Sequence, residues 1–167
     1  MKNQKKKPLS ILKKVKFLVF DFDGVFTDNR VLVFEDGQEG VFCWRGDGLG
    51  LEALRKAGIA LMAISTEKNR LVGRRCLKLN LPCIQGCVNK LKVFLKEVKR
   101  RSLDPEEVAF MGNDINDIGC LKAAGFSICV KDSHPAAMAI SDYVTKTRGG
   151  YGAVREVCDI ITGANND

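Results

Sequence analysis

Short apolar runs alternate along this chain with segments of helical periodicity. The run at 17–20, FLVF, ends abruptly in charged and turn residues, which is typical of a buried strand. Comparable runs follow at 60–64, 82–85, 108–111, 126–130 and 143–145. Helical patterns separate them at 48–57, 68–78, from 90 onward, 116–124, after Pro135 and from 152 onward. Strands that alternate with helices predict an α/β fold with a parallel sheet and helices on both faces.

The segment at 29–44 breaks this alternation. It contains two β-rich runs around Asp36-Gly37, a pair of residues that favours a tight turn. We therefore expect a small β-hairpin inserted after the first strand. Because residues 16–167 contain no repeat, linker or low-complexity block, we expect them to form a single domain.

Two carboxylates, Asp21 and Asp23, stand one residue apart directly after the first strand and are followed by Gly24. In open α/β sheets ligands bind beyond the carboxyl ends of the strands. Two carboxylates this close repel one another, and a bound cation relieves the repulsion. Mg²⁺ prefers oxygen ligands and often completes its shell with substrate phosphate. The pattern predicts a magnesium site and an anionic substrate.

Later strand ends supply further polar groups. They comprise a hydroxyl pair, a lysine and an acidic cluster: Ser65, Thr66, Lys90, Asn113, Asp114 and Asp117. A hydroxyl and a lysine are suited to binding phosphoryl oxygens. Asp21 is ionised at neutral pH and needs no base to attack phosphorus, while Asp23 is placed to act as acid and base. A calcium loop, the competing interpretation of Asp-x-Asp-Gly, requires a glutamate where the chain has Leu32.

This ordered series resembles the haloacid dehalogenase (HAD) superfamily of phosphohydrolases from residue 16 to residue 161. The motif DFDGVFT at 21–27 is similar to the first motif of that family, and GNDIND at 112–117 is similar to the fourth. The resemblance implies a three-layer Rossmann-like fold and an aspartyl-phosphate mechanism. It implies catalytic roles for four residues, namely Asp21, Asp23, Ser65 and Lys90. The implied Mg²⁺ ligands are Asp21, Asp23, Asn113, Asp114 and Asp117.

One position departs from the family pattern. The fourth motif usually begins with an aspartate that binds the metal, and this chain has Asn113 there. An amide oxygen can bind Mg²⁺ but brings no negative charge, so we expect either weakened metal affinity or charge supplied through bound water by Asp114 and Asp117.

The absence of a large inserted cap resembles the branch of the superfamily that dephosphorylates 2-keto-3-deoxy sugar acids. The segments at 45–59 and 147–161 support this resemblance. In that branch tetramers are usual, the hairpins form a central barrel, and a neighbouring subunit helps to close each active site. The resemblance therefore implies a homotetramer, with the glycine-rich stretch at 148–152 contributing to closure; its alternative is a flexible loop before the last helix.

Residues 66 and 67 help to choose among the candidate substrates. Members that act on KDO 8-phosphate commonly carry Gly-Arg after the hydroxyl position, whereas this chain carries Thr66-Glu67. Glu67 with Arg75 resembles relatives that act on nine-carbon acids such as KDN 9-phosphate or N-acetylneuraminate 9-phosphate. We therefore favour a nonulosonate 9-phosphate over KDO 8-phosphate, although the two residues could equally form a helix-surface ion pair. Further candidate substrate contacts are Thr66, Arg45, Asp47, Lys68 and Arg148.

Composition adds a basic arm at residues 1–15. The net charge of +7 is matched by seven lysines that precede residue 17, where no acid occurs. We expect a solvated, partly disordered arm. The alternative is nucleic-acid binding, as in a nucleic-acid end phosphatase, but no aromatic side chains interleave with the lysines to stack on bases.

The sequence predicts neither a membrane-spanning helix nor a catalytic or metal-binding thiol. No apolar run reaches the roughly 18 residues of a membrane helix, and the start lacks the apolar centre of a signal peptide, so we expect a cytoplasmic protein. The seven cysteines lack metal-site spacing and are expected to be reduced thiols. A last alternative is a non-catalytic assembly domain associated with sialic-acid activation, which the retained Asp21 and Asp23 disfavour.

Overall fold

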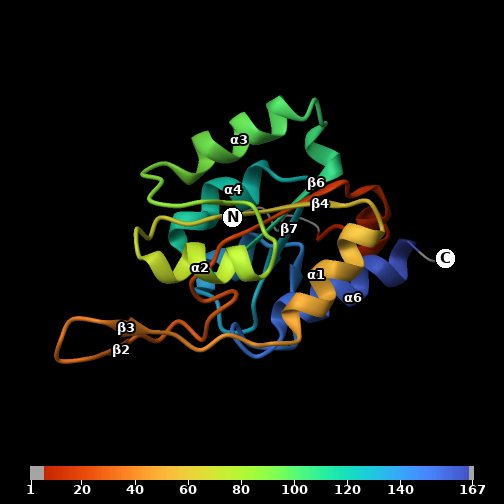
Figure 1. Cartoon of the computed structure of the whole chain (residues 1–167). Coiled ribbons are helices and arrows are strands. Elements are labelled where there is room, and N and C mark those ends of the chain that lie inside the picture. Colours follow the sequence, from red (N-terminus) through yellow and green to blue (C-terminus); the bar gives the residue numbers. More distant parts are fainter. Residues whose placement is uncertain (1–5, 166–167) are drawn as a thin grey trace.

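The computed structural model describes residues 6–165, with side chains as far as residue 163, and is built on a six-stranded parallel sheet (Figure 1). The strand order is β5-β4-β1-β6-β7-β8. The bounds are β1 (Phe17–Phe20), β4 (Ala60–Ile64), β5 (Cys83–Ile84), β6 (Val108–Gly112), β7 (Phe126–Cys129) and β8 (Tyr143–Val144). Central β1 pairs with β4 and β6, with Phe17 opposite Ala60 and Val108. The predicted parallel α/β sheet is confirmed.

Helices cover both faces of this sheet (Figure 1). They are α1 (Asp47–Lys56), α2 (Arg70–Lys78), α3 (Lys90–Arg100), α4 (Ile118–Ala123), α5 (Pro135–Ile140) and α6 (Ala153–Asn165), with short 3₁₀ turns η2 (Pro105–Glu107) and η3 (Ile115–Asp117). The layers explain why β1 is apolar throughout. Leu18 and Phe20 join the core under α1, α2 and α6, whereas Phe17 and Val19 join the core under α3 and α4.

The predicted hairpin is present and projects from the body of the molecule (Figure 1). Its strands are β2 (Leu32–Val33) and β3 (Glu39–Gly40). An isolated β-bridge between Thr27 and Cys43 joins the two arms of the hairpin at its base. Apolar side chains along both arms face solvent, including Val33, which is 64% exposed, and Phe42, which is 68% exposed. The hairpin therefore buries little of its own apolar surface.

The basic arm is shorter than the sequence suggests. Residues 1–5 lie outside the described residues, but Leu9–Lys14 forms a 3₁₀ helix, η1, that packs on α6. Leu12 and Val15 are buried in the core, while Lys13 and Lys14 remain exposed. The packed region thus begins before residue 16 because these two apolar side chains dock between lysines that stay in solvent.

Two further expectations concern the described part of the chain. Its cysteines are all free thiols, and five of them are buried. Between residues 6 and 165, no helix combines the length and the apolar composition needed to cross a bilayer.

Candidate active site

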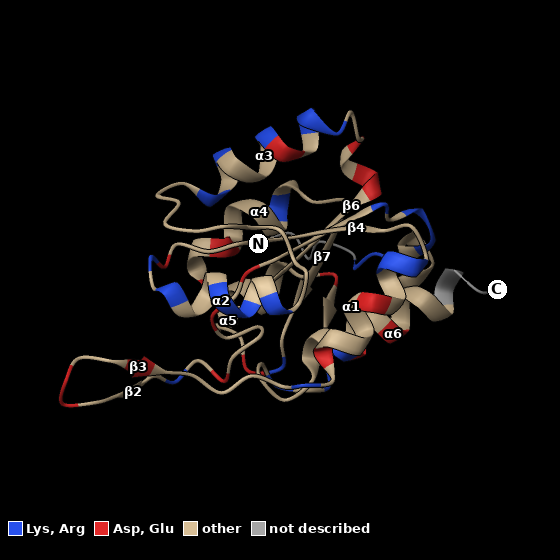
Figure 2. Cartoon of the chain, viewed as in Figure 1, with Lys and Arg blue, Asp and Glu red and all other residues tan. Residues whose placement is uncertain are grey.

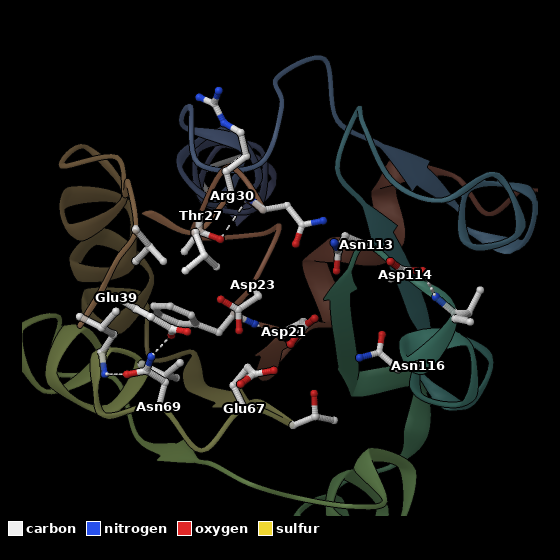
Figure 3. A pocket seen from close by; sticks show the side chains of 18 residues that line it. Asp21, Asp23, Thr27, Arg30, Glu39, Glu67, Asn69, Asn113, Asp114 and Asn116 are labelled. Carbon is white, nitrogen blue, oxygen red and sulfur yellow. Dashed lines mark hydrogen bonds between the residues drawn. The ribbon is translucent and has the colours of Figure 1, made fainter. Parts of the chain in front are cut away.

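A cavity of about 410 Å³ opens at the carboxyl ends of β1, β4 and β6. The hairpin supplies one wall and the turn after β6 supplies the opposite wall (Figure 3). Asp21 and Asp23 lie between these walls, near the middle of the view. The parallel register of the three central strands brings their ends to the same edge, which is why segments far apart in sequence meet here.

Asp21 is held from behind by a buried lysine. Its Oδ1 lies 2.7 Å from Lys90 Nζ and accepts the Phe22 N–H at 2.7 Å. Lys90 also contacts Asp117 Oδ1 at 2.7 Å, so one ammonium group bridges two carboxylates. Among residues 6–163, no hydrogen bond is made to Asp21 Oδ2, which leaves this oxygen for chemistry in the cavity.

The titration of this group reflects its burial. Burial and the charge of Asp117 together raise the pKa of Asp21 to about 7, against the opposing effect of Lys90. Burial lowers the pKa of Lys90, but the two carboxylates outweigh it and leave that pKa above its usual value. A cation beside Asp21 would favour its ionised form in the same way that Lys90 does.

Asp23 lies half-buried at the cavity surface on the turn that follows β1. Burial raises its pKa, and the neighbouring charges of Glu67 and Glu39 raise it further. The turn is shaped by Thr27, whose Oγ1 accepts the Gly24 N–H at 3.0 Å. A raised pKa suits a group that must donate a proton and later take one back.

The turn after β6 brings Asn113 and Asp114 to the opposite wall. Gly24 has a φ of +75°, and a Cβ at this position would lie 2.0 Å from the Asn113 side-chain nitrogen. Only glycine therefore lets the Asn113 carboxamide reach the loop that carries Asp21 and Asp23.

This arrangement fits a hard cation. Carboxylate and carboxamide oxygens from both walls face a common space, and they are the donors that Mg²⁺ prefers. Within the described residues, no set of three or more His, Cys, Asp or Glu side chains can hold an ion by itself. An ion here would therefore need additional ligands such as the Asn113 carboxamide, a backbone carbonyl, water or phosphate.

Asp117 has a different position from the one expected of a metal ligand. It is fully buried, and its Oδ2 accepts the backbone N–H groups of Asn113 at 2.9 Å and Asp114 at 3.3 Å. With Oδ1 occupied by Lys90, Asp117 fixes the turn and the lysine from behind. Both of its oxygens are therefore engaged within the protein, and its role as a metal ligand stays a prediction.

The hydroxyl position is split between two residues. Ser65 is buried after β4, and its Oγ accepts the Glu67 N–H at 3.0 Å, which shapes the loop. Thr66 and Glu67 line the cavity itself. The Ser65 hydroxyl retains its own hydrogen for donation, but Thr66 is the hydroxyl that the cavity surface presents.

Five expected substrate contacts lie outside the cavity lining: Arg45, Asp47, Lys68, Arg75 and Arg148. Arg75 donates from NH2 to the Trp44 carbonyl at 3.1 Å, because its position on α2 faces the base of the hairpin. Asp47 is buried between helices and accepts the Arg155 N–H at 3.1 Å; burial raises its pKa to about 6. Arg45 and Arg148 are exposed on loops. None of these side chains reaches the cavity within a single subunit, so their contact with substrate stays a prediction.

The glycine-rich stretch packs behind the loop after β1. A Cβ at Gly149 would lie 1.9 Å from the Gly24 carbonyl oxygen, and the Gly150 N–H donates to the Val25 carbonyl at 3.1 Å. Residues 149 and 150 therefore pack against the loop that carries Asp23. In the structure this stretch is fixed to that loop and is more than a connection to the last helix.

Sequence reasoning missed the hairpin as a wall of the site. Arg30, Val31, Glu39 and Val41 line the cavity, together with Asn69 at the start of α2. The hairpin was predictable as an element, but nothing in its sequence shows how it is oriented relative to the sheet. Asn69 had a recognisable signal: asparagine is a favoured helix N-cap, and α2 begins at 70 rather than at 68.

Comparison with known proteins identifies the family. Residues 78–166 match the family of haloacid dehalogenase-like hydrolases. The 3-deoxy-D-manno-octulosonate 8-phosphate phosphatase KdsC of Escherichia coli K12 is 35% identical over 148 residues, which are 88% of this chain and 79% of that protein. The chain belongs to the haloacid dehalogenase-like hydrolases. This membership confirms the predicted superfamily and enzyme class.

Solved structures of HAD proteins have the same fold. A 3-deoxy-D-manno-octulosonate 8-phosphate phosphatase from Moraxella catarrhalis, in complex with magnesium, phosphate and KDO, has a TM-score of 0.91 at 34% identity. The match covers 95% of this chain and 91% of that one. A HAD family hydrolase from Streptomyces avermitilis has a TM-score of 0.89 at 38% identity, covering 91% and 87%. The predicted cofactor, Mg²⁺, is thus an ion bound in the Moraxella structure.

Proposed function

We propose that this HAD enzyme is a Mg²⁺-dependent phosphomonoesterase that hydrolyses the phosphate ester of a 2-keto-3-deoxy sugar acid in the cytoplasm. The observation that carries the proposal is the position of Asp21. Its Oδ1 is bonded to Lys90 and its Oδ2 is left without a protein partner among the described residues, beside Asp23 and opposite Asn113. This is the arrangement that a carboxylate nucleophile needs.

The proposed reaction has two steps. Asp21 Oδ2 attacks phosphorus, the bond from phosphorus to the ester oxygen breaks, and Asp23 gives its proton to the departing alkoxide. Asp23 then takes a proton from water, whose oxygen attacks phosphorus and releases Asp21 and inorganic phosphate. Lys90 fixes the nucleophile, and Thr66 is placed to bind a phosphoryl oxygen. Bound Mg²⁺ would offset the repulsion between Asp21 and the phosphate.

KDO 8-phosphate is the first candidate substrate because the curated relatives are KDO 8-phosphate phosphatases and the chain covers most of their length. A nonulosonate 9-phosphate, such as KDN or N-acetylneuraminate 9-phosphate, is the second candidate. It is favoured by Glu67, which lines the cavity and can accept hydrogen bonds from sugar hydroxyls or an amide N–H. Arg75, the other half of that expectation, contacts Trp44 instead.

The experiment is a turnover assay on a panel of eight- and nine-carbon keto-acid phosphates, with and without Mg²⁺. We expect one sugar-acid phosphate to exceed a generic aryl phosphate in kcat/KM, and we expect Asp21→Asn to abolish turnover of both. An absence of turnover on every phosphate ester would contradict the proposal and favour the assembly domain associated with sialic-acid activation.

The hairpin supports assembly into a homotetramer. Its arms expose Val33, Phe34 and Phe42, and exposed apolar side chains clustered on one element mark interaction surfaces. A neighbouring subunit could also bring the exposed Arg45 or Arg148 toward the cavity. Light scattering on wild type and Val33→Asp tests this: the wild type should have the mass of four chains, and the variant a lower mass.

The lysine arm supports the remaining alternative, a nucleic-acid end phosphatase. Deletion of residues 1–7 removes four lysines but leaves Leu12 and Val15 in the core. We expect this deletion to leave the turnover of sugar-acid phosphates intact. Salt-sensitive binding to an oligonucleotide that disappears with the deletion would favour the nucleic-acid function.

A further inference from the structure

Asn69 joins three segments that surround the cavity. Its side-chain oxygen accepts the Leu71 N–H at 3.0 Å and so caps α2. Its backbone carbonyl accepts a hydrogen bond of 2.8 Å from the Gln85 side chain, just after β5. Its side-chain N–H₂ donates to Glu39 Oε2 on β3 of the hairpin. One residue therefore connects the hairpin to the sheet edge.

Within one subunit, little packing fixes the hairpin. It projects from the molecule, and its apolar side chains are exposed, so packing against the body does little to hold it (Figure 1). At its base the two arms of the hairpin are joined by the β-bridge between Thr27 and Cys43. The bond from Asn69 to Glu39 holds the hairpin farther out, where Glu39 and Val41 form the wall of the cavity.

Glu39 faces the cavity across from the Asn113 side (Figure 3). One of its oxygens is taken by Asn69, and no hydrogen bond is made to the other by the described residues. Figure 2 shows acidic positions on β3 and at the hairpin tip. A carboxylate in this wall repels the phosphate and the carboxylate of a sugar acid but accepts hydrogen bonds from hydroxyl groups.

We propose that Glu39 is a specificity-determining residue that accepts a hydrogen bond from a hydroxyl group of the sugar, and that Asn69 is the positioning residue that holds it in place. This inference rests on the proposed function, because it assigns the hydroxyl-bearing part of the substrate to the hairpin wall. A small ester that ends near the phosphoryl group does not reach Glu39. Selectivity for the sugar should therefore depend on the bond between residues 69 and 39.

The kinetic test uses the ratio of kcat/KM for the preferred sugar-acid phosphate to kcat/KM for p-nitrophenyl phosphate. Asn69→Asp keeps the helix cap but repels Glu39, and should lower this ratio about tenfold, mainly through KM of the sugar phosphate. Adding Glu39→Gln to Asn69→Asp lets the new amide donate to the aspartate, and should recover at least a few-fold of the loss. A folding defect would lower kcat/KM for both substrates by the same factor and leave the ratio constant.

The matched control is Glu35→Gln, which removes a hairpin glutamate that lies in the exposed turn. Its ratio should stay within about twofold of wild type, as expected of an exposed surface change. A ratio within twofold of wild type in Asn69→Asp, or no recovery in the double variant, would overturn the proposal.

A second measurement does not depend on turnover. Hydrogen exchange of residues 31–42 should be faster in Asn69→Asp than in wild type and should slow again in the double variant. Unchanged exchange in Asn69→Asp would refute the positioning role. If no phosphate ester is hydrolysed by the wild type, the proposed function fails, and the exchange data still decide whether Asn69 holds the hairpin.

Discussion

Replacement of Lys90 by methionine is the most direct perturbation of the site. The Lys90 ammonium lies 2.7 Å from a carboxylate oxygen of Asp21 and 2.7 Å from one of Asp117. All three side chains are buried. Methionine fills a similar volume but leaves two buried carboxylates facing one another without a cation, so the variant should lose both stability and activity.

The size of the effect follows from these distances. With an effective dielectric constant of about 20, Coulomb's law gives about 6 kcal/mol for each 2.7 Å contact. The cost of burying the ions offsets much of this attraction. Removal of one partner from a buried ion pair typically costs about 3–5 kcal/mol, because the remaining charge is left uncompensated. We expect a loss of this size in the free energy of unfolding.

Urea unfolding at neutral pH, without metal, measures this loss. Lys92→Met is the matched control, because Lys92 lies on the exposed face of the same helix and should change the free energy of unfolding by less than about 0.5 kcal/mol. Adding Asp117→Asn to Lys90→Met removes one of the facing charges and should restore part of the loss. A Lys90→Met protein as stable as the control would refute the reasoning.

Three further predictions test separate features. Gly24→Ala and Gly58→Ala should each cost about 1–2 kcal/mol of stability because both glycines have positive φ, but only Gly24→Ala should lower kcat, by about a hundredfold, because its Cβ displaces Asn113. Asn113→Asp adds a charge to the proposed metal site and should lower the Mg²⁺ concentration for half-maximal activity about tenfold; an unchanged requirement would place the ion elsewhere. The Asp47 carboxyl has a folded pKa of about 6, raised by burial, so the free energy of unfolding should fall as the pH rises from about 4 through 6. Asp47→Asn should flatten this fall in urea midpoints measured at several pH values, and an equally steep fall would assign it to another group.

Much of the fold could be predicted from the sequence because its signals are local. Four apolar residues in succession at 17–20 indicate a strand buried on both faces, and β1 has those bounds. Asp36-Gly37 predicted the hairpin turn, and Gly37 has a φ of +80° there. The end of α2 was also predicted, whereas its start shifted to Arg70 because Asn69 is the cap.

The site was only partly predictable for a physical reason. Residues directly after parallel strands must meet at one edge, so Asp21, Asp23 and Asn113 could be brought together from sequence order alone. The direction of a side chain on a helix or a long loop has no such constraint. Arg75 therefore turned toward Trp44, and Asp47 packed against the start of α6.

By itself, the sequence determined which functional groups occur and in what order along the chain. They are a carboxylate pair, a hydroxyl pair, a lysine and a turn with an amide and acids, and each follows a strand or opens a helix. Tertiary structure alone decided that Lys90 bridges Asp21 and Asp117, and that the hairpin forms a wall fixed by Asn69 and Glu39. Both depend on contacts between residues 27 to 69 positions apart in the chain, where local pattern contains no information about distance. Packing of the sheet and helices sets those distances.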